Sequence, residues 1–156
     1  MVRVIPNALC IGVTQRHLPA SNHQFARDAL DTDWYDWFAS HWPRCRFIAI
    51  PNFTDPSRAV HYAQEWDIDL LILSGGEDVA SSPVRDAVEH ALLVHARSVG
   101  WPVIGVCRGM QFLHLADGGT LVRQPGHVGM LHTILCGSET ITLNSWHHWA
   151  AADLMP

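Results

Sequence analysis

The chain has 156 residues, of which 48% are hydrophobic and 16% charged, and its formal net charge is -5. This length fits one domain with a buried core, while the mild acidity and the scattered Lys and Arg residues argue against a nucleic-acid-binding surface. No apolar run is long enough to cross a bilayer, and residues 1–13 lack the cleavage site of a signal peptide, so neither a membrane nor a nucleic-acid partner is expected.

The first half of the chain alternates short apolar runs with amphipathic segments. Strands are predicted over 8–13 and 46–50, and helices over 22–41 and 56–66. One face of the first helix collects apolar side chains at helical spacing, namely Leu30, Trp34, Trp37 and Phe38. At the start of the second helix, Asp55 or Ser57 is placed to cap the free backbone N–H groups.

The second half continues the same alternation. Strands are predicted over 70–73, 103–106 and 140–143, helices over 83–99 and 110–116, and a loop over 124–135. Gly100 suits the end of the helix before it. Nearly continuous apolar strands alternating with helices predict an α/β fold with a parallel sheet covered on both faces. Functional residues of such folds lie at the carboxyl ends of strands, where 74–76 and Cys107 fall.

The segment Gly105-Val106-Cys107-Arg108-Gly109 places a cysteine at a strand-to-helix junction. This is the pattern of a nucleophile elbow with Cys in place of Ser. The sharp turn strains the nucleophile, the glycines avoid a clash across the turn, and the N–H groups of the following helix favour the reactive thiolate. The alternative is that Cys107 is an inert, buried thiol at the end of a strand.

Several segments in chain order carry a family resemblance, namely 12–16, 74–78, 85–89, 102–111, 118–121 and 144–148. Together they resemble class I glutamine amidotransferases, and the first and last of them resemble the γ-glutamyl hydrolase branch. The resemblance covers essentially the whole chain. It implies a flavodoxin-like three-layer sandwich with a mostly parallel central sheet. It also implies one domain over 1–156 that lacks its C-terminal strands.

The resemblance assigns roles to particular residues. Cys107 would attack a γ-glutamyl carbonyl and form a thioester. The backbone N–H groups of Arg108 and of either Gly75 or Gly76 would form the oxyanion hole. The α-amino and α-carboxylate groups of the glutamyl unit would be held by Gln111, Ser145 and Trp146. These residues also have ordinary structural explanations: Gln111 can be a residue on a helix surface, and Ser145 can be a turn-forming residue in a loop.

The sequence departs from the family pattern at the general base. Members carry a catalytic His paired with Glu in a Trp-His-Pro-Glu-like segment, whereas this sequence ends at Leu154-Met155-Pro156 without one. The sequence is then truncated, or degenerate, or uses another histidine, and truncation is the favoured interpretation. His147 and His148 are the substitutes considered, and a structural hydrogen bond to a loop carbonyl is the alternative role of His147.

The remaining His and Cys residues predict neither a metal site nor a cofactor. A cluster near the C-terminus, namely His127, His132, Cys136, His147 and His148, matches no known zinc spacing. The four cysteines include no C-x-x-C pair, which favours a reduced, cytoplasmic protein.

Three functions follow from these patterns. The leading one is hydrolysis of a γ-glutamyl amide with release of glutamate. The second is a glutaminase subunit that passes ammonia from glutamine to a synthetase partner. The third is a truncated or degenerate relative that binds a ligand without chemistry. A weaker option is a cysteine-elbow fold of the stress-protein or peptidase type, against which Gln111 and the segment 144–148 argue.

Overall fold

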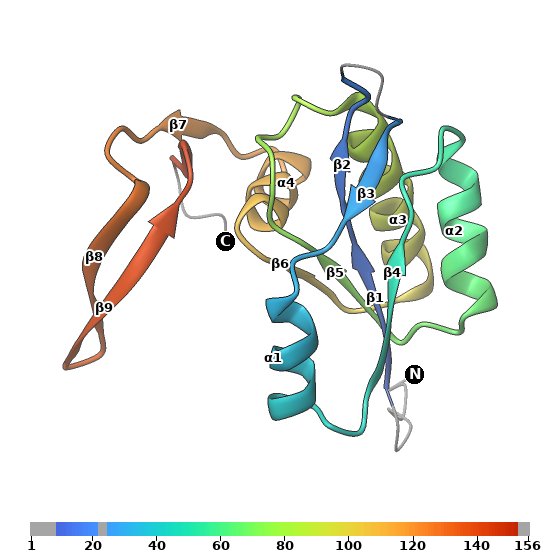
Figure 1. The fold of residues 1–156 in the computed structure, drawn as a ribbon, viewed down its shortest axis with the longest axis horizontal. Coiled ribbons are helices and arrows are strands. Elements are labelled where there is room, and N and C mark those ends of the chain that lie inside the picture. The colour runs from blue at the N-terminus through green and yellow to red at the C-terminus, as the bar shows by residue number, and fades with distance from the viewer. Residues whose placement is uncertain (1–8, 22–24, 153–156) are drawn as a thin grey trace. The chain divides into compact units, whose positions relative to one another are not determined.

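The computed structural model describes residues 9–21 and 25–152, and its central feature is a parallel sheet (Figure 1). Its strands lie in the order β4-β1-β5-β6, and their bounds are β1 (Cys10–Thr14), β4 (Arg46–Ile50), β5 (Leu70–Leu73) and β6 (Val103–Gly105). The strand order reverses at β1, so the carboxyl ends of β1 and β5 lie beside a topological switch point. The chain divides into two units, Met1–Met110 and Gln111–Pro156, and each is described by itself.

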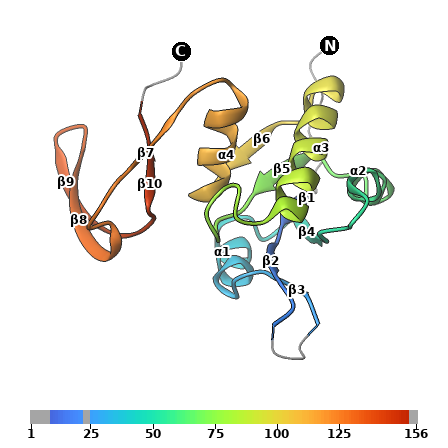
Figure 2. The same ribbon diagram turned by 90° about the horizontal axis from the view of Figure 1, so that it is seen from above.

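The two central strands of the sheet in the first unit, β1 and β5, are buried on both faces. On one face, Phe38 of helix α1 (Asp33–His41) joins the buried strand residues Ile11, Val13, Leu70 and Ile72 in one cluster. The opposite face is covered by two neighbouring helices, α2 (Pro56–Glu65) and α3 (Pro83–Val99) (Figure 2). This arrangement confirms the predicted α/β fold with a mostly parallel sheet and helices on both faces.

The predicted helix over 22–41 is correct only from Asp33 onward. Residues 22–24 lie outside the described residues, and the chain on either side forms an antiparallel pair, β2 (Arg16–Leu18) with β3 (Arg27–Ala29). The Asp28 carboxylate accepts hydrogen bonds from the backbone N and the Nδ2 of Asn52, both at 2.8 Å. These long-range bonds hold Asp28 in a strand, which local helical spacing does not reveal.

The other elements of the first unit follow the prediction closely. Strands β4 and β5 and helix α3 have the predicted bounds, and the predicted strand over 8–13 is observed as β1. Residue 8 lies outside the described residues. Helix α3 ends at Gly100, whose φ of 76° is the left-handed conformation that glycine adopts without strain.

Helix α2 begins at an aspartate cap. The Asp55 carboxylate accepts hydrogen bonds from Ser57 N at 3.0 Å and from Ser57 Oγ at 2.8 Å. These bonds lower the pKa of Asp55 below its ordinary value. Because a lowered carboxyl pKa stabilises the fold above the unfolded pKa of about 3.9, this contribution is lost as the pH falls through the folded value.

We therefore expect Asp55→Ala to lower the midpoint of thermal unfolding at pH 7, and to have less effect at pH 3. Glu65→Ala, which changes an exposed carboxylate in the last turn of the same helix, is the matched control and is expected to leave the midpoint nearly unchanged. Calorimetry of the three proteins at both pH values checks this. Equal losses at the two pH values would contradict the role of the carboxylate as a cap.

The second unit contains short sheets that the sequence only partly predicts. Helix α4 (Arg108–Ala116), whose first three residues belong to the first unit, begins two residues before its predicted start. Strands β8 (Val128–Cys136) and β9 (Glu139–Trp146) form a hairpin, and β7 (Leu121–Arg123) pairs with β10 (Trp149–Ala151). The predicted loop over 124–135 is therefore wrong, because most of it is β8. The strand predicted over 140–143 is the middle of β9.

The reason for the missed strand is its exposure. Nearly all residues of β8 are exposed on both faces of the hairpin, so no alternation of buried and exposed side chains marks the strand. The segment is a strand because it pairs with β9, and a pattern within one segment does not reveal its pairing with another. Among the described residues, no helix is long and apolar enough to cross a membrane.

Candidate active site

Cys107 occupies a strained turn between β6 and α4. Its φ is 52°, a left-handed conformation that non-glycine residues rarely adopt. The turn is held by backbone bonds on either side: Val106 N–H donates to Leu73 O at 2.9 Å, and Gly109 N–H donates to Val106 O at 2.9 Å. Cys107 is exposed, so it is not the buried cysteine that the alternative interpretation expects at this position.

The glycines that flank Cys107 are required by close backbone packing. A Cβ added at Gly105 would lie 2.5 Å from the carbonyl carbon of Gly109, and one added at Gly109 would lie 2.0 Å from Leu73 O. Neither contact involves a flexible side chain that could move aside. The first turn of α4 can therefore approach Gly105 of β6 and Leu73 of β5 this closely only because both positions lack a side chain.

A second glycine segment lies beside the thiol. Gly75 and Gly76 follow β5, and a Cβ added at Gly75 would lie 3.6 Å from the Cβ of Cys107. Gly76 has a φ of 142°, and a Cβ there would lie 2.6 Å from Cγ of Arg16 and from Nη1 of Arg85. The sequence-predicted residues Cys107, Arg108, Gly75 and Gly76 are thus brought together at the carboxyl end of the sheet.

Arg85 supports the backbone of this second segment. Its side chain is fully buried, and Nη2 donates to Ser74 O at 2.8 Å and to Gly75 O at 3.1 Å. The same guanidinium pairs with Glu77 at 3.0 Å and with Glu89 at 2.9 Å. Arg85 therefore holds the backbone next to Cys107 while its own charge is balanced by carboxylates on either side.

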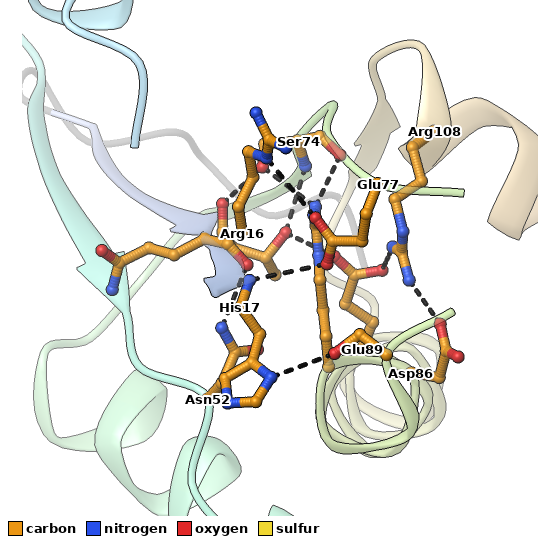
Figure 3. A network of polar contacts seen from close by, with 12 residues as sticks. Arg16, His17, Asn52, Ser74, Glu77, Asp86, Glu89 and Arg108 are labelled. Carbon is orange, nitrogen blue, oxygen red and sulfur yellow. Dashed lines mark hydrogen bonds and ion pairs between the residues drawn. The ribbon is translucent and has the colours of Figure 1, made fainter. Parts of the chain in front are cut away.

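Arg108 has a role that the sequence did not predict. The sequence pattern assigns a function only to its backbone N–H, yet its buried side chain reaches α3 and pairs with Asp86 and Glu89 (Figure 3). The sequence does contain one indication of this pairing. The helix predicted before Cys107 carries Asp86 and Glu89, whose negative charges could pair with Arg108, besides the positive charge of Arg85. The residue after Cys107 is thus anchored to α3, the helix that precedes β6.

The two outer carboxylates of this network have opposite pKa shifts. Burial raises the pKa of Glu77, but its own backbone N–H and the charge and hydrogen bond of Arg85 outweigh burial, and the net pKa is below the ordinary value. For Asp86, burial outweighs the charge of Arg108 and raises the pKa. Contact with Arg85 thus favours the ionised form of Glu77, whereas burial disfavours that of Asp86.

The other cysteines differ from Cys107 in their surroundings. Burial raises the pKa of the Cys10 and Cys45 thiols, which disfavours the reactive thiolate. Cys136 is exposed, like Cys107, but lies at the end of a hairpin strand with an exposed carboxylate, Glu139, as its cross-strand partner. It therefore serves as a matched comparison for the chemistry of Cys107.

Gln111, Ser145 and Trp146 belong to the second unit. Gln111 is 4% exposed, and its Nε2 donates to Trp149 O at 2.7 Å, which ties α4 to β10. Ser145 Oγ donates to His127 O at 2.7 Å and lies 2.6 Å from His132 Nε2. Trp146 is 72% exposed. Each of the two polar side chains thus has a structural bond within its own unit.

His147 belongs to a chain of hydrogen-bonded rings. Its Nδ1 lies 2.9 Å from Trp149 O, so the hydrogen-bond network assigns the proton to Nδ1. Its Nε2 then accepts from His127 Nδ1 at 3.2 Å. The rings of His127 and His132 stack with centroids 4.0 Å apart. These bonds favour a structural role for His147, since both of its ring nitrogens are occupied.

The histidine chain makes the hairpin sensitive to pH. Partial burial and then the charges of His132 and His147 lower the pKa of His127. The folded hairpin thus binds protons less readily than the unfolded chain, so stability is lost as the pH falls below about 6.5.

We expect faster amide exchange in β8 and β9 at pH 5 than at pH 7, after correction for the intrinsic pH dependence. His61→Gln, at an exposed position of α2, should leave this difference unchanged, while His127→Gln should reduce it.

Within residues 9–21 and 25–152, no three His, Cys, Asp or Glu side chains are placed to hold a metal ion.

Comparisons with known proteins point to one family. A model of the peptidase C26 family matches residues 11–128. The chain is 28% identical over 149 residues to the protein NtpR of Enterococcus hirae, covering 70% of this chain and 60% of that protein. A stretch of 68 residues is 59% identical to a putative glutamine amidotransferase of Mycobacterium tuberculosis, covering 35% of this chain and 22% of that protein.

The fold also matches a solved structure. The crystal structure of a putative GMP synthase subunit from Thermoplasma acidophilum superposes with a TM-score of 0.62 at 18% identity, covering 94% of this chain and 68% of that one. At this identity the likeness concerns the fold alone. It confirms the flavodoxin-like architecture expected from the sequence. The chain spans no more than 60% of the length of the curated relatives that it matches.

Proposed function

Because the chain belongs to the peptidase C26 family of class I glutamine amidotransferase-like proteins, we propose that it hydrolyses a γ-glutamyl amide and releases glutamate. The observation that carries the proposal is the exposed thiol of Cys107, held at a φ of 52° on a turn that packs against the Gly75–Gly76 segment. A strained, exposed nucleophile beside backbone N–H donors is the arrangement that acyl transfer requires.

In the proposed reaction, the sulfur of Cys107 attacks the γ-carbonyl carbon, and the oxyanion accepts hydrogen bonds from the N–H of Arg108 and of Gly75 or Gly76. The amine then leaves with a proton, and a thioester to Cys107 remains. Water attacks the thioester, glutamate is released and the thiol is restored. Gln111, Ser145 and Trp146 would hold the α-amino and α-carboxylate groups.

A base must accept the thiol proton and later activate water. His147 is the candidate within the chain, but its bonds to Trp149 O and to His127 support the structural role instead. A base other than His147 is then required. If His147→Gln leaves the rate of thioester formation at Cys107 unchanged, His147 has only the structural role.

The test of the proposed function is covalent capture. An electrophilic glutamine analogue should add once to the protein, at Cys107, and excess glutamine should block the addition. Intact mass and peptide mapping report the number and position of adducts, and Cys107→Ala is the control. Labelling of Cys136 at the same rate, or no adduct at all, would count against a glutamyl site and favour a non-catalytic relative.

A second candidate is a glutaminase subunit that delivers ammonia to a synthetase. The fold likeness to a protein described as a putative GMP synthase subunit favours it. Exposed apolar side chains on the β8–β9 hairpin, including Leu131 and Leu135, also suit a partner surface. Release of ammonia from glutamine by the isolated chain would support the stand-alone hydrolase. Turnover only after addition of a synthetase would support the second candidate.

A further inference from the structure

One buried carboxylate, that of Glu89, joins the two backbone segments that lie beside Cys107. Glu89 is on α3 and fully buried. Its Oε1 accepts from Arg85 Nε at 2.9 Å and from Thr14 Oγ1 at 2.7 Å, and its Oε2 accepts from Arg108 Nη1. Figure 3 shows Glu89 and Arg108 within this network of polar contacts.

Arg85 and Arg108 each link Glu89 to one of the two backbone segments. Arg85 donates to the carbonyl oxygens of Ser74 and Gly75, at 2.8 and 3.1 Å. Arg108 directly follows Cys107 in the sequence, so its side chain ties the turn itself to Glu89. The Gly75–Gly76 segment and the turn at Cys107 therefore share one anchor, although they come from different strands.

The charges of the network balance. Three arginines, Arg16, Arg85 and Arg108, face three carboxylates, Glu77, Asp86 and Glu89. Buried ion pairs of this kind seldom add net stability over well-packed apolar residues, because desolvation offsets their attraction. What they supply is directional placement, since each guanidinium fits its partners in only a narrow range of orientations. Such a network beside a nucleophile is therefore suited to positioning.

We propose that Glu89 is a positioning residue for the reaction at Cys107. It fixes the position of the turn that carries the thiol relative to the Gly75–Gly76 segment. The sulfur and the oxyanion-binding N–H groups can then act on the same substrate carbonyl group. This role rests on the proposed function, because register matters only if both segments act on the same substrate. A displacement of about 1 Å between such groups costs up to about 100-fold in rate.

The first measurement tests the connection without any chemistry. Glu89→Gln preserves the shape of the side chain but places an amide N–H₂ opposite a guanidinium and removes the charge. Amide hydrogen exchange should then accelerate at Ser74 and Gly109, whose N–H groups bond to Thr14 Oγ1 and Val106 O. Asp28→Asn is the matched control, because it alters another hydrogen-bonded carboxylate of the same unit that binds Asn52 instead.

The second measurement compares two reagents at Cys107. An electrophilic glutamine analogue needs the sulfur and the N–H donors in register, whereas iodoacetamide needs only the thiolate. Glu89→Gln should slow labelling by the glutamine analogue about tenfold or more, and change labelling by iodoacetamide less than about twofold. Asp28→Asn should change neither rate by more than about twofold.

The outcomes separate the two proposals. If the unaltered chain does not react with the glutamine analogue, the proposed function fails, and the exchange comparison alone decides whether Glu89 couples the two segments. If both reagents slow equally in Glu89→Gln, or if Asp28→Asn loosens Ser74 and Gly109 to the same degree, the positioning role is overturned. Should Glu89→Gln not fold, Arg108→Lys keeps the charge but cannot bind Glu89 and Asp86 with one planar group, and the same results are expected.

Discussion

Replacement of Cys107 by Ser is expected to reduce hydrolysis of a chromogenic γ-glutamyl amide by about 1,000-fold or more. A serine hydroxyl fits the turn and keeps its φ, but it is far less acidic than a thiol and is a weak nucleophile without a strong base. The change therefore removes the chemistry while leaving the fold intact. Steady-state rates, with circular dichroism to show that the variant is folded, check this.

Cys136→Ser is the matched control for that substitution. Cys136 is also an exposed, free thiol, but it lies in β8 and not in the turn. Its replacement should change the rate less than about twofold, because the proposed chemistry involves only Cys107. Similar losses in both variants would mean that general thiol reactivity, and not an activated site, produces the observed cleavage.

Gly109→Ala is expected to lower the free energy of unfolding by about 3 kcal/mol or more. The added Cβ would lie 2.0 Å from Leu73 O, a backbone atom of a buried strand that cannot move without distorting the sheet. No positive φ is involved at this position, so the cost is steric alone. Urea denaturation monitored by fluorescence measures it.

Gly100→Ala separates steric from conformational cost. At Gly100 a Cβ would meet nothing within 4 Å, but φ is 76°, so the only penalty is the left-handed backbone. That penalty is about 1 kcal/mol. The two substitutions should thus differ by about 2 kcal/mol or more. Equal destabilisation would mean that the turn at Cys107 relaxes around the methyl group and is less tightly packed than its geometry indicates.

Short-range patterns predicted the parts of this fold that depend on short-range physics. The apolar run of Leu70–Leu73, the cap at Asp55 and the terminator at Gly100 each act within a few residues, and each is present as expected. The small-residue pattern around Cys107 likewise predicted a sharp turn, because it describes a steric requirement of the backbone itself.

Long-range pairing set the features that the sequence did not predict. Strand β3 pairs with β2 and is bound to Asn52 through Asp28, and β8 pairs with β9. The side chain of Arg108 is a further case, since its partners Asp86 and Glu89 lie about twenty residues earlier in the chain. Periodicity within a segment contains no information about such partners, so they emerge only from the three-dimensional structure.

At Cys107, the side chain that the proposed chemistry needs is also one that strains the backbone and so lowers the stability of the fold. A left-handed φ of 52° is comfortable for glycine and strained for cysteine. A lineage selected for stability alone would therefore gain by exchanging the cysteine side chain for the hydrogen atom of glycine, and it would lose the proposed nucleophile in the same step. The turn thus stores a small part of the folding free energy as local strain, and that part is recovered only by giving up the cysteine side chain.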